Sequence, residues 1–431
     1  MRAKNAHGAA FPRLLPLFLL TVFFASCAAR ERPVVIWTDR AEFASYVEQF
    51  NNGQDALKDG TKAIVVYKER LSEALSAGKA DVRPDLVVGA FLTSSGLGRQ
   101  LSGLSSLFGG LLREGGIRRD DFYRPLLDAG AGKLIPVSFN LPMVIFSSKN
   151  AAFVSQDRML TPDEIRDDAA RFNARSENGA YTRMGFAPSW NRDFLYLLAK
   201  MNGADFAQGG NGLVWNDRAL AETADYLTDW TLGQNTGSSS EDDFSFKYLY
   251  TPNYKQVSSG RCLFAYSDSD DFFRRSQDQI ADIDFRWICS GGADTRIFVD
   301  DGIVALALHK KSANKANAKK FIAWFFSKDT QKSLLERSAR MNLGVRSFGI
   351  CGGFSAMKGV NDEFFPVHYK NLLGNLPAEE LLASPRPVPE RWMSLKERVI
   401  LPYLAEKSKT DAGADVKSME ERLDIWRKQF D

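Results

Sequence analysis

Histidine and cysteine are scarce in this chain of 431 residues, which contains three histidines and four cysteines. Only His309 and His368 lie beyond the first thirty residues. The chain has no C-x-x-C pair of the kind that binds metals and no G-x-S-x-G turn of the kind that presents a nucleophilic serine. A zinc site and a histidine-dependent catalytic triad are therefore not expected. We predict that the protein is not an enzyme and holds no metal and no cofactor.

The chain also lacks an excess of either charge. Its 56 lysines and arginines nearly balance 53 aspartates and glutamates, which leaves a formal net charge of +3. Neither half is strongly basic, so the electrostatic pattern of a nucleic-acid-binding protein is missing. Beyond the N-terminal region no apolar run is long enough to span a bilayer. We therefore expect neither a nucleic acid partner nor a transmembrane helix.

The N-terminal residues have the pattern of an export signal. Arg2, Lys4 and Arg13 carry positive charge, and residues 14–24 form an apolar run of the length found in signal peptides, too short to cross a bilayer. We predict a signal peptide at residues 1–26 and an extracytoplasmic location, in the periplasm or at the cell surface.

The predicted signal peptide is followed directly by a cysteine. The segment Phe24-Ala25-Ser26-Cys27 resembles a lipobox, in which small residues precede a cysteine that is acylated after cleavage. Acyl chains would hold the protein on a membrane at about 0.8 kcal/mol per buried CH₂. We predict lipidation, including palmitate, at Cys27 and a lipidated linker at residues 27–32. A signal peptide that is cleaved without lipidation is the alternative.

Three cysteines remain when Cys27 is set aside. One disulfide with one free thiol, or three buried thiols, are both compatible with Cys262, Cys289 and Cys351.

Strand and helix patterns alternate along the chain, which is too long for one typical core and favours two lobes. Residues 33–37 form an apolar run typical of a buried parallel strand. In the following segment Phe43, Tyr46, Val47 and Phe50 have the spacing of one buried helix face. Both patterns indicate an α/β protein.

The stretch from Thr295 to Leu335 shows this organisation most clearly. Two short apolar runs, 296–299 and 303–308, are separated by Asp300, Asp301 and Gly302. Such a chain can leave one sheet, turn and enter another. A helix with an apolar stripe is expected next, and a second helix after it. The residues of the stripe are Ala316, Phe321, Ile322, Phe325 and Phe326.

This order of elements resembles the extracellular solute-binding proteins of ATP-driven importers, and most closely the maltose-binding-like subgroup. The resemblance extends over nearly the whole mature chain and implies a type II periplasmic-binding-protein-like fold. In such a fold two lobes, each a mixed, mostly parallel sheet flanked by helices, are joined by a three-segment hinge. We therefore expect lobe 1 at residues 33–138 and 300–344, and lobe 2 at residues 139–299 and 345–431.

Two of the expected hinge segments carry recognisable patterns. The first is Leu134–Lys149, for which a simple β-hairpin is the alternative, and the last is Met341–Arg346. Hinge segments must absorb backbone rotation without breaking a core.

The resemblance also implies a ligand site between the lobes. Loops that follow parallel strands meet at one edge of a sheet, where ligands of open α/β sheets bind. Some candidates have competing structural roles, because Asp39 could cap a helix and Trp190 could be a core residue. The candidate ligand-binding residues are Asp39, Arg40, Ala90, Phe91, Thr93, Phe139, Asn140, Trp190, Asn191, Asp270, Asp271, Asp300, Asp301 and Arg346.

The function implied is that of a monomeric receptor that binds a sugar or oligosaccharide and delivers it to the transmembrane subunits of an ABC permease. Planar aromatic rings mixed with acidic and amide groups suit sugar rings that bear hydroxyls. Two alternatives remain. A cationic solute such as a polyamine is favoured if the five candidate aspartates converge, and a lipoprotein hydrolase or adhesin could use the same scaffold.

Overall fold

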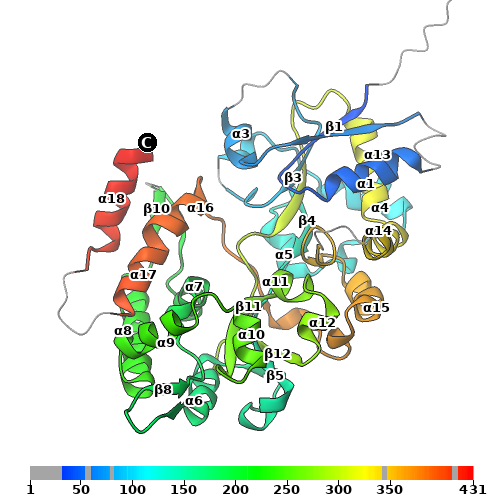
Figure 1. Ribbon diagram of the computed structural model, residues 1–431. Helices are drawn as coiled ribbons and strands as arrows, with labels where there is room; N and C mark the ends of the chain where they lie inside the picture. Colours follow the sequence, from blue (N-terminus) through cyan, green and yellow to red (C-terminus); the bar gives the residue numbers. More distant parts are fainter. Residues whose placement is uncertain are drawn as a thin grey trace, which may run out of the picture.

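The computed structural model describes residues 32–53, 60–77, 82–94, 96–210, 212–341, 347–409 and 416–430. The predicted signal peptide, Cys27 and Arg346 lie outside the described residues. Within the described ranges, no helix combines the length and the apolar character needed to cross a membrane. The chain forms two lobes, each built around its own β-sheet, with β1, β3 and α1 in one and β5 and β12 in the other (Figure 1).

Lobe 1 is built on a six-stranded sheet. Buried apolar side chains dominate its central strands, as expected for strands covered on both faces. β1 pairs in parallel with β2 and β3, whereas β14 and β15 join the sheet antiparallel. In spatial order the strands are β15 (Phe354–Ser355), β4 (Leu134–Phe139), β14 (Val304–Leu308), β3 (Leu86–Gly89), β1 (Val34–Thr38) and β2 (Ala63–Tyr67).

Helices cover both faces of this sheet. On one face the rings of Phe43 and Phe50 pack against Phe325 and Phe321, with centroids 5.5 and 5.0 Å apart. These rings belong to the two predicted apolar stripes. The first stripe is confirmed, and the second is confirmed except at Ala316, which is exposed. The opposite face is covered by α3. The helices of lobe 1 are α1 (Phe43–Asn52), α3 (Leu71–Ala77), α4 (Leu111–Glu114), α5 (Arg124–Ala129), α13 (Lys315–Phe325), α14 (Lys328–Met341) and α15 (Lys358–His368).

Lobe 2 is built on a four-stranded sheet with the order β11 (Phe264–Asp268), β5 (Pro142–Ser147), β12 (Ile283–Ile288) and β6 (Met159–Leu160). β5 runs antiparallel to both of its neighbours, and β12 pairs in parallel with β6. Both sheets are mixed, as predicted. The expectation of mostly parallel sheets is wrong for the described strands, because antiparallel pairings outnumber parallel pairings in both sheets.

Helices and short strand pairs complete lobe 2. In Figure 1 the C-terminal helices lie beside the green helices of this lobe, and α17 contacts α7 and α8. The helices are α6 (Pro162–Phe172), α7 (Arg192–Met201), α8 (Asp217–Asn235), α9 (Ser238–Lys247), α10 (Asn253–Ser258), α11 (Ser269–Phe273), α12 (Gln277–Ile280), α16 (Trp392–Leu395), α17 (Leu401–Lys407) and α18 (Met419–Phe430). The short strands are β7 (Ala174–Arg175), β8 (Tyr181–Arg183), β9 (Ala207–Gly209), β10 (Gly212–Val214), β13 (Ile297–Phe298) and β16 (Leu382–Ala383).

Two predicted connections between the lobes are found where the sequence patterns place them. β4 belongs to the six-stranded sheet and β5 to the four-stranded sheet, so the alternative of a β-hairpin is wrong. Residues 299–303 lead from β13 into β14 of lobe 1.

The last connection differs from the prediction. Residues 342–346 lie outside the described residues, and the chain beyond them is still part of lobe 1. Phe354 and Ser355 pair with β4, and Lys328 of α14 forms an ion pair with Glu363 of α15. The return to lobe 2 follows at residues 369–381, before β16 pairs with β13. The expected boundary at residue 345 is therefore wrong, because strand pairing with β4 keeps the next segment in the six-stranded sheet.

Cys262, Cys289 and Cys351 are all free thiols and all buried. Of the two alternatives left open by the sequence, the structure shows three buried thiols.

Candidate ligand-binding cleft

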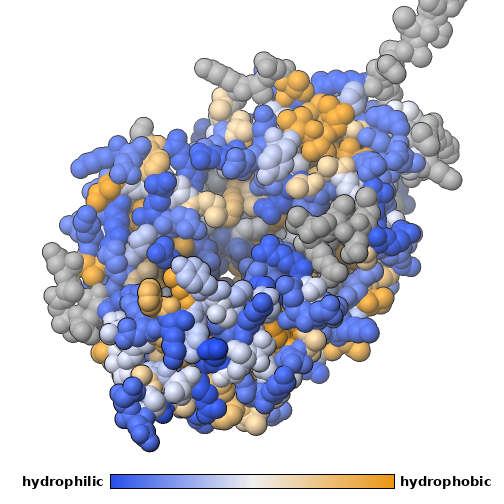
Figure 2. Space-filling model, in the orientation of Figure 1, coloured by the Kyte–Doolittle hydropathy of each residue, from blue (hydrophilic) through white to orange (hydrophobic). Residues whose placement is uncertain are grey.

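The two lobes enclose a cleft made of two adjoining cavities, of about 340 and 810 Å³. Figure 2 shows the surface hollowed between the lobes. Lobe 1 contributes the loops after β1 and β3, and lobe 2 contributes α7, α16, the end of β11 and the turn before β14. Both cavities are lined by Arg40, Ala90, Phe91, Trp392, Met393 and Glu397. We call this space the interlobe cleft.

Asp39 holds the lobe 1 edge of the cleft together. Its carboxylate accepts a hydrogen bond from the Ala90 N–H at 3.2 Å and pairs with Arg40 Nε at 2.9 Å. Burial raises the pKa of Asp39, and the charge of Arg40 only partly opposes this effect. Asp39 therefore ties the loop after β1 to the loop after β3. The predicted alternative, a cap for α1, is wrong because Glu42 occupies the N-cap position and makes no side-chain cap.

Gly89 allows the close approach of these two loops. A Cβ atom at this position would lie 2.5 Å from Leu71 Cδ2 and 2.6 Å from Asp39 Oδ1. Such distances are below van der Waals contact, so a side chain at residue 89 would force Leu71 and Asp39 to shift.

The lobe 2 wall contains a buried ionic network. Lys200 of α7 pairs with Asp301 at 2.7 Å, and the Tyr196 hydroxyl donates to the same carboxylate at 2.5 Å. Burial alone would raise the pKa of Asp301, but the charge and hydrogen bond of Lys200 and the hydrogen bond of Tyr196 lower it below the ordinary value. Asp301 therefore remains ionised and fixes α7 to the segment that enters β14.

Lys396 extends this network toward α16. It pairs with Asp193 at 2.8 Å, and its ammonium lies 4.5 Å from the centroid of the Tyr196 ring. Burial lowers the pKa of Lys396, but the carboxylates of Asp300 and Asp193 outweigh burial and raise it. The wall therefore presents fixed charges of both signs to the cleft.

Asp268 lies at the carboxyl end of β11, where it lines the smaller cavity. Its side chain accepts a hydrogen bond of 2.7 Å from the Asp271 N–H and so caps α11. Burial, and then the carboxylate of Asp300, raise the pKa of Asp268 to about 6, although the cap lowers it. In the described part of the chain Asp268 has no ion-pair partner. It is a carboxylate that a ligand could neutralise or hydrogen-bond.

Aromatic rings from both lobes line the cleft. Phe91 comes from lobe 1, and Tyr266, Phe298 and Trp392 come from lobe 2. Trp392 is 2% exposed, and its Nε1–H is buried without a hydrogen-bond partner in the described residues. A buried indole donor that lacks a partner at the wall of a cavity indicates a place for an acceptor group.

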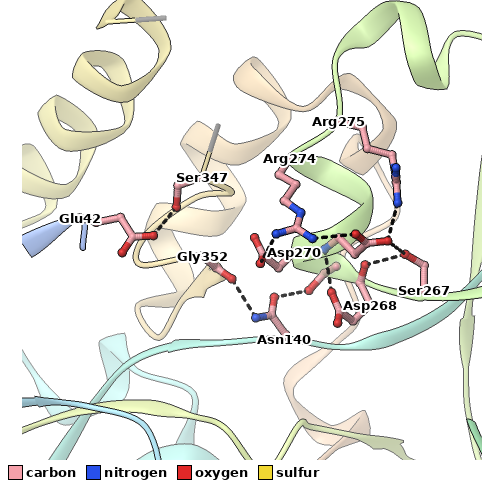
Figure 3. Close-up of polar contacts among 11 residues, drawn as sticks. Glu42, Asn140, Ser267, Asp268, Asp270, Arg274, Arg275, Ser347 and Gly352 are labelled. Atoms are coloured by element: carbon pink, nitrogen blue, oxygen red, sulfur yellow. Dashed lines mark hydrogen bonds and ion pairs between the residues drawn. The ribbon is translucent and has the colours of Figure 1, made fainter. Parts of the chain in front are cut away.

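Figure 3 shows the polar contacts beside the hinge. Asn140 Nδ2 donates to the Gly352 carbonyl at 2.8 Å, and Asn140 Oδ1 accepts from Ser269 Oγ at 2.5 Å. Asn140 thus connects the β4–β5 crossing with α11 of lobe 2 and with the loop before β15.

Seven of the predicted residues line the interlobe cleft. They are Asp39, Arg40, Ala90, Phe91, Asn140, Asp300 and Asp301. They come from four separate segments, and the strand-end argument predicted the two that follow β1 and β3.

Three of the other predicted residues lie elsewhere for clear reasons. Phe139 packs in the core against Tyr123, with ring centroids 5.2 Å apart, because its side chain points to the buried face of β4. Trp190 stacks on Phe244 at 5.5 Å, and Asn191 caps α7. Phe139 therefore faces a core. Trp190 and Asn191 line a separate cavity of about 110 Å³, which shares Tyr266 with the smaller cavity of the interlobe cleft.

Thr93, Asp270 and Asp271 do not line the cleft either. Burial alone would raise the pKa of Asp271, but hydrogen bonds and charges from Arg274 and Arg275 lower it. Asp270 lies 3.9 Å from Arg274. The two aspartates therefore interact with cations close to them in the sequence, and the five candidate aspartates do not converge.

Sequence reasoning missed several residues of the lobe 2 wall. Asp193, Tyr196 and Lys200 are spaced i, i+3 and i+7 along α7, which places them on one face of an otherwise apolar helix. This spacing in the sequence could have identified a polar face of α7 that lines the cleft. Trp392 and Lys396 belong to a short helical segment whose pattern does not distinguish a cleft from a core.

Comparison with known proteins agrees with this geometry. The family model described as "Bacterial extracellular solute-binding protein" matches residues 58–332, well over half of the chain. The chain belongs to this family. A search of curated proteins found no match for this solute-binding protein.

Solved structures of similar fold cover 92% of this solute-binding protein. One is a cyclo/maltodextrin-binding protein complexed with maltotetraose, with a TM-score of 0.60, 15% identity and 97% of its own chain covered. Another is the maltose-maltodextrin binding protein of Alicyclobacillus acidocaldarius, with a TM-score of 0.55, 14% identity and 99% covered. A third is the cyclic alpha-maltosyl-1,6-maltose binding protein from Arthrobacter globiformis, with a TM-score of 0.56, 14% identity and 97% covered. At this identity the likeness shows the two-lobed fold.

Proposed function

We propose that this solute-binding protein is an extracytoplasmic receptor that binds a sugar or oligosaccharide in the interlobe cleft and delivers it to an ABC permease. The observation that carries the proposal is the lining of the cleft. Aromatic rings from both lobes stand beside carboxylates and lysines, a combination that can stack on sugar rings and hydrogen-bond their hydroxyls. The names of structurally similar proteins, which bind maltodextrins and related sugars, support the same ligand class.

Binding would work by closure of the two lobes. Phe91 and Arg40 lie on one lobe, and Trp392 and Asp300 on the other. A ligand that contacts both sets gains contacts only when the lobes approach each other, so it favours the closed state by its differential affinity. The rotation would be absorbed where the chain crosses between the sheets, near Asn140, near Asp300 and within residues 369–381.

The family and the N-terminal pattern support the location and the partners that we propose. An extracellular solute-binding protein acts outside the cytoplasm. We propose that Cys27 carries the lipid anchor, that the receptor is a monomer, and that the transmembrane subunits of the permease receive the ligand. The proposal assigns binding to the cleft, with no catalytic step.

Calorimetric titration with maltodextrins, mannooligosaccharides and monosaccharides tests the ligand class, and solution scattering tests closure. We expect one of these sugars to bind with 1:1 stoichiometry and to reduce the radius of gyration. Trp392→Phe and Asp300→Asn should each weaken binding about tenfold, as expected for the loss of one good polar contact. Trp190→Phe is the matched control, because Trp190 lies outside the interlobe cleft, and it should bind as the wild type does.

One observation favours a second candidate ligand. Asp268 and Asp300 line the smaller cavity, and neither has an ion-pair partner in the described part of the chain. A cationic solute such as a polyamine could neutralise both. Spermidine therefore belongs in the same titration. If spermidine binds and no sugar does, the ligand of this receptor is a cationic solute and the sugar proposal is wrong. Hydrolysis of a ligand without closure would instead favour an enzyme.

A further inference from the structure

Lobe 1 contains a separate cavity of about 310 Å³ that shares no lining residue with the interlobe cleft. Its lining includes the buried Trp37 of β1, Leu75 of α3 and His309, and the exposed Arg83. His309 follows β14, which pairs antiparallel with β3, so the cavity opens at the amino end of β3. The interlobe cleft lies at the carboxyl end of the same strand. We call this cavity the basic pocket.

Four cations surround the basic pocket. Arg83, Arg99, Lys310 and Lys311 all line it, and all four are exposed. None of the four has an ion-pair partner in the described ranges of the chain. Burial, together with the charges of Arg83 and Lys311, lowers the pKa of the neighbouring His309. The cations around the pocket therefore act on the pKa of His309 in the same direction as burial.

Two buried polar atoms of the basic pocket have no hydrogen-bond partner in the described residues. They are Trp37 Nε1 and His309 Nδ1. Trp37 is 3% exposed and His309 is 7% exposed, so both side chains are more than nine-tenths buried. Buried polar groups nearly always find partners. Trp37 and His309 both line the cation-rich cavity, so an anion with acceptor oxygens is a candidate partner for these ring nitrogens.

The basic pocket lies beside the start of the described chain. Arg32 is 3.7 Å from Asp85, and its carbonyl accepts a hydrogen bond of 2.6 Å from Asn314 Nδ2. Asp85 in turn accepts from Ser312 Oγ at 2.7 Å, next to Lys311. Cys27 is five residues before Arg32, so the two Cα atoms are at most about 19 Å apart. If Cys27 carries a lipid, the pocket lies close to a membrane surface.

We propose that the basic pocket is an anion site that takes a phosphoryl group, either from the headgroup of an anionic lipid or from a soluble phosphate. The four cations supply charge-assisted hydrogen bonds to its oxygens. The indole N–H of Trp37 supplies a neutral donor. The site is independent of the sugar proposal, since it shares no residue with the interlobe cleft.

Titration with inorganic phosphate at low salt, followed by calorimetry and by tryptophan fluorescence, tests the site. The chain from residue 28 to the C-terminus retains every described element and avoids the lipid itself. We expect one phosphate per chain, with an affinity that falls as salt rises. Trp37→Phe should abolish the fluorescence response and weaken binding several-fold.

A charge variant and a matched control distinguish phosphate binding at this pocket from non-specific electrostatic attraction of phosphate to the protein. Arg99→Gln combined with Lys310→Gln should weaken phosphate binding at least tenfold. Lys247→Gln combined with Lys255→Gln removes the same charge from exposed positions on lobe 2 and should leave phosphate binding unchanged. Thermal denaturation of both double variants, compared with the wild type, checks that they are folded.

Co-sedimentation with vesicles identifies the source of the phosphoryl group. Binding to phosphatidylglycerol vesicles, but not to phosphatidylcholine vesicles, with competition by inorganic phosphate, assigns the lipid headgroup. Phosphate binding without vesicle binding assigns a soluble phosphate. The proposal is overturned if neither probe binds, or if the Arg99/Lys310 variant binds both probes as well as the Lys247/Lys255 control.

Discussion

The main-chain N–H of Asp300 donates a hydrogen bond of 3.1 Å to the carbonyl oxygen of Asn140. Two segments that are 160 positions apart in the sequence (300 − 140) therefore run side by side where the chain passes between the sheets. The Asn140 side chain adds contacts to Gly352 and Ser269. Asn140 and Asp300 therefore join two of the three crossings that a rotation of one lobe against the other would involve.

Asn140→Ala should therefore affect both stability and binding. It leaves the Gly352 carbonyl and the Ser269 hydroxyl without their partner, so we expect the free energy of unfolding to fall by about 1–3 kcal/mol. Ligand affinity should fall as well, because the β4–β5 crossing is no longer linked by this side chain to Gly352 and Ser269. Urea denaturation and calorimetry measure the two effects. Asn178→Ala is the control, since the Asn178 side chain contacts only its own loop; equal effects of the two substitutions would contradict the role of Asn140.

Gly89→Ala should damage the lobe 1 edge of the interlobe cleft. The new Cβ would collide with Leu71 and Asp39, so we expect a loss of about 1–3 kcal/mol in the free energy of unfolding and weaker ligand binding. Gly233→Ala is the matched control, because a Cβ there meets nothing within 4 Å on helix α8. That control should gain about 0.5–1 kcal/mol. Thermal and chemical denaturation test both, and unaltered ligand affinity in Gly89→Ala would show that Asp39 had not moved.

The Lys200–Asp301 pair should behave as one unit in a double-mutant cycle. The side chains are 13% and 6% exposed, so Asp301→Asn leaves a buried charge without its partner and should cost about 3–5 kcal/mol. Adding Lys200→Met should recover part of this loss, which gives a coupling energy above about 1 kcal/mol. The exposed pair Arg218–Glu222 offers a control cycle, expected to stay below about 0.5 kcal/mol. Additive losses at Lys200 and Asp301 would refute the coupling.

Asp268 should make stability depend on pH in an unusual direction. Its folded-state pKa, about 6, is above the ordinary 3.8. Between these values the folded state binds more protons than the unfolded state, so the free energy of unfolding should fall as pH rises through this window. Asn at position 268 can still cap α11 but does not titrate. Asp268→Asn should therefore remove a change in the free energy of unfolding on the order of 2 kcal/mol between pH 4 and pH 7. The difference between the two proteins in urea denaturation at several pH values measures it. Parallel curves would show that Asp268 titrates normally.

The local elements of this fold could be predicted because their patterns depend on close neighbours in the sequence. The stripe of Phe43, Tyr46, Val47 and Phe50 repeats at helical spacing, and all four side chains are buried. Asp39 and Ala90 directly follow buried strands, and the ends of adjacent parallel strands meet at one edge. These are short-range regularities, and they led to the right part of the interlobe cleft.

The lobe 2 wall could not be predicted in the same way. The pattern of residues 184–186 predicts a strand with Trp190 and Asn191 just beyond its carboxyl end, but no strand forms at these residues, so the strand-end argument does not hold there. An aromatic ring fits a core as well as a cleft, and only tertiary packing decides between them. Trp392 reaches the interlobe cleft from a segment about 200 residues further along the chain, and no local pattern specifies that meeting.

The pairing of β15 with β4 constrains the order in which this chain can fold. The edge of β4 stays open until Phe354 and Ser355 are available to cover it. During synthesis or export, the first half of the polypeptide therefore emerges long before its own sheet can be completed. Chains arrested before Ser355 would present an unpaired strand edge, the kind of surface to which chaperones and aggregating chains attach.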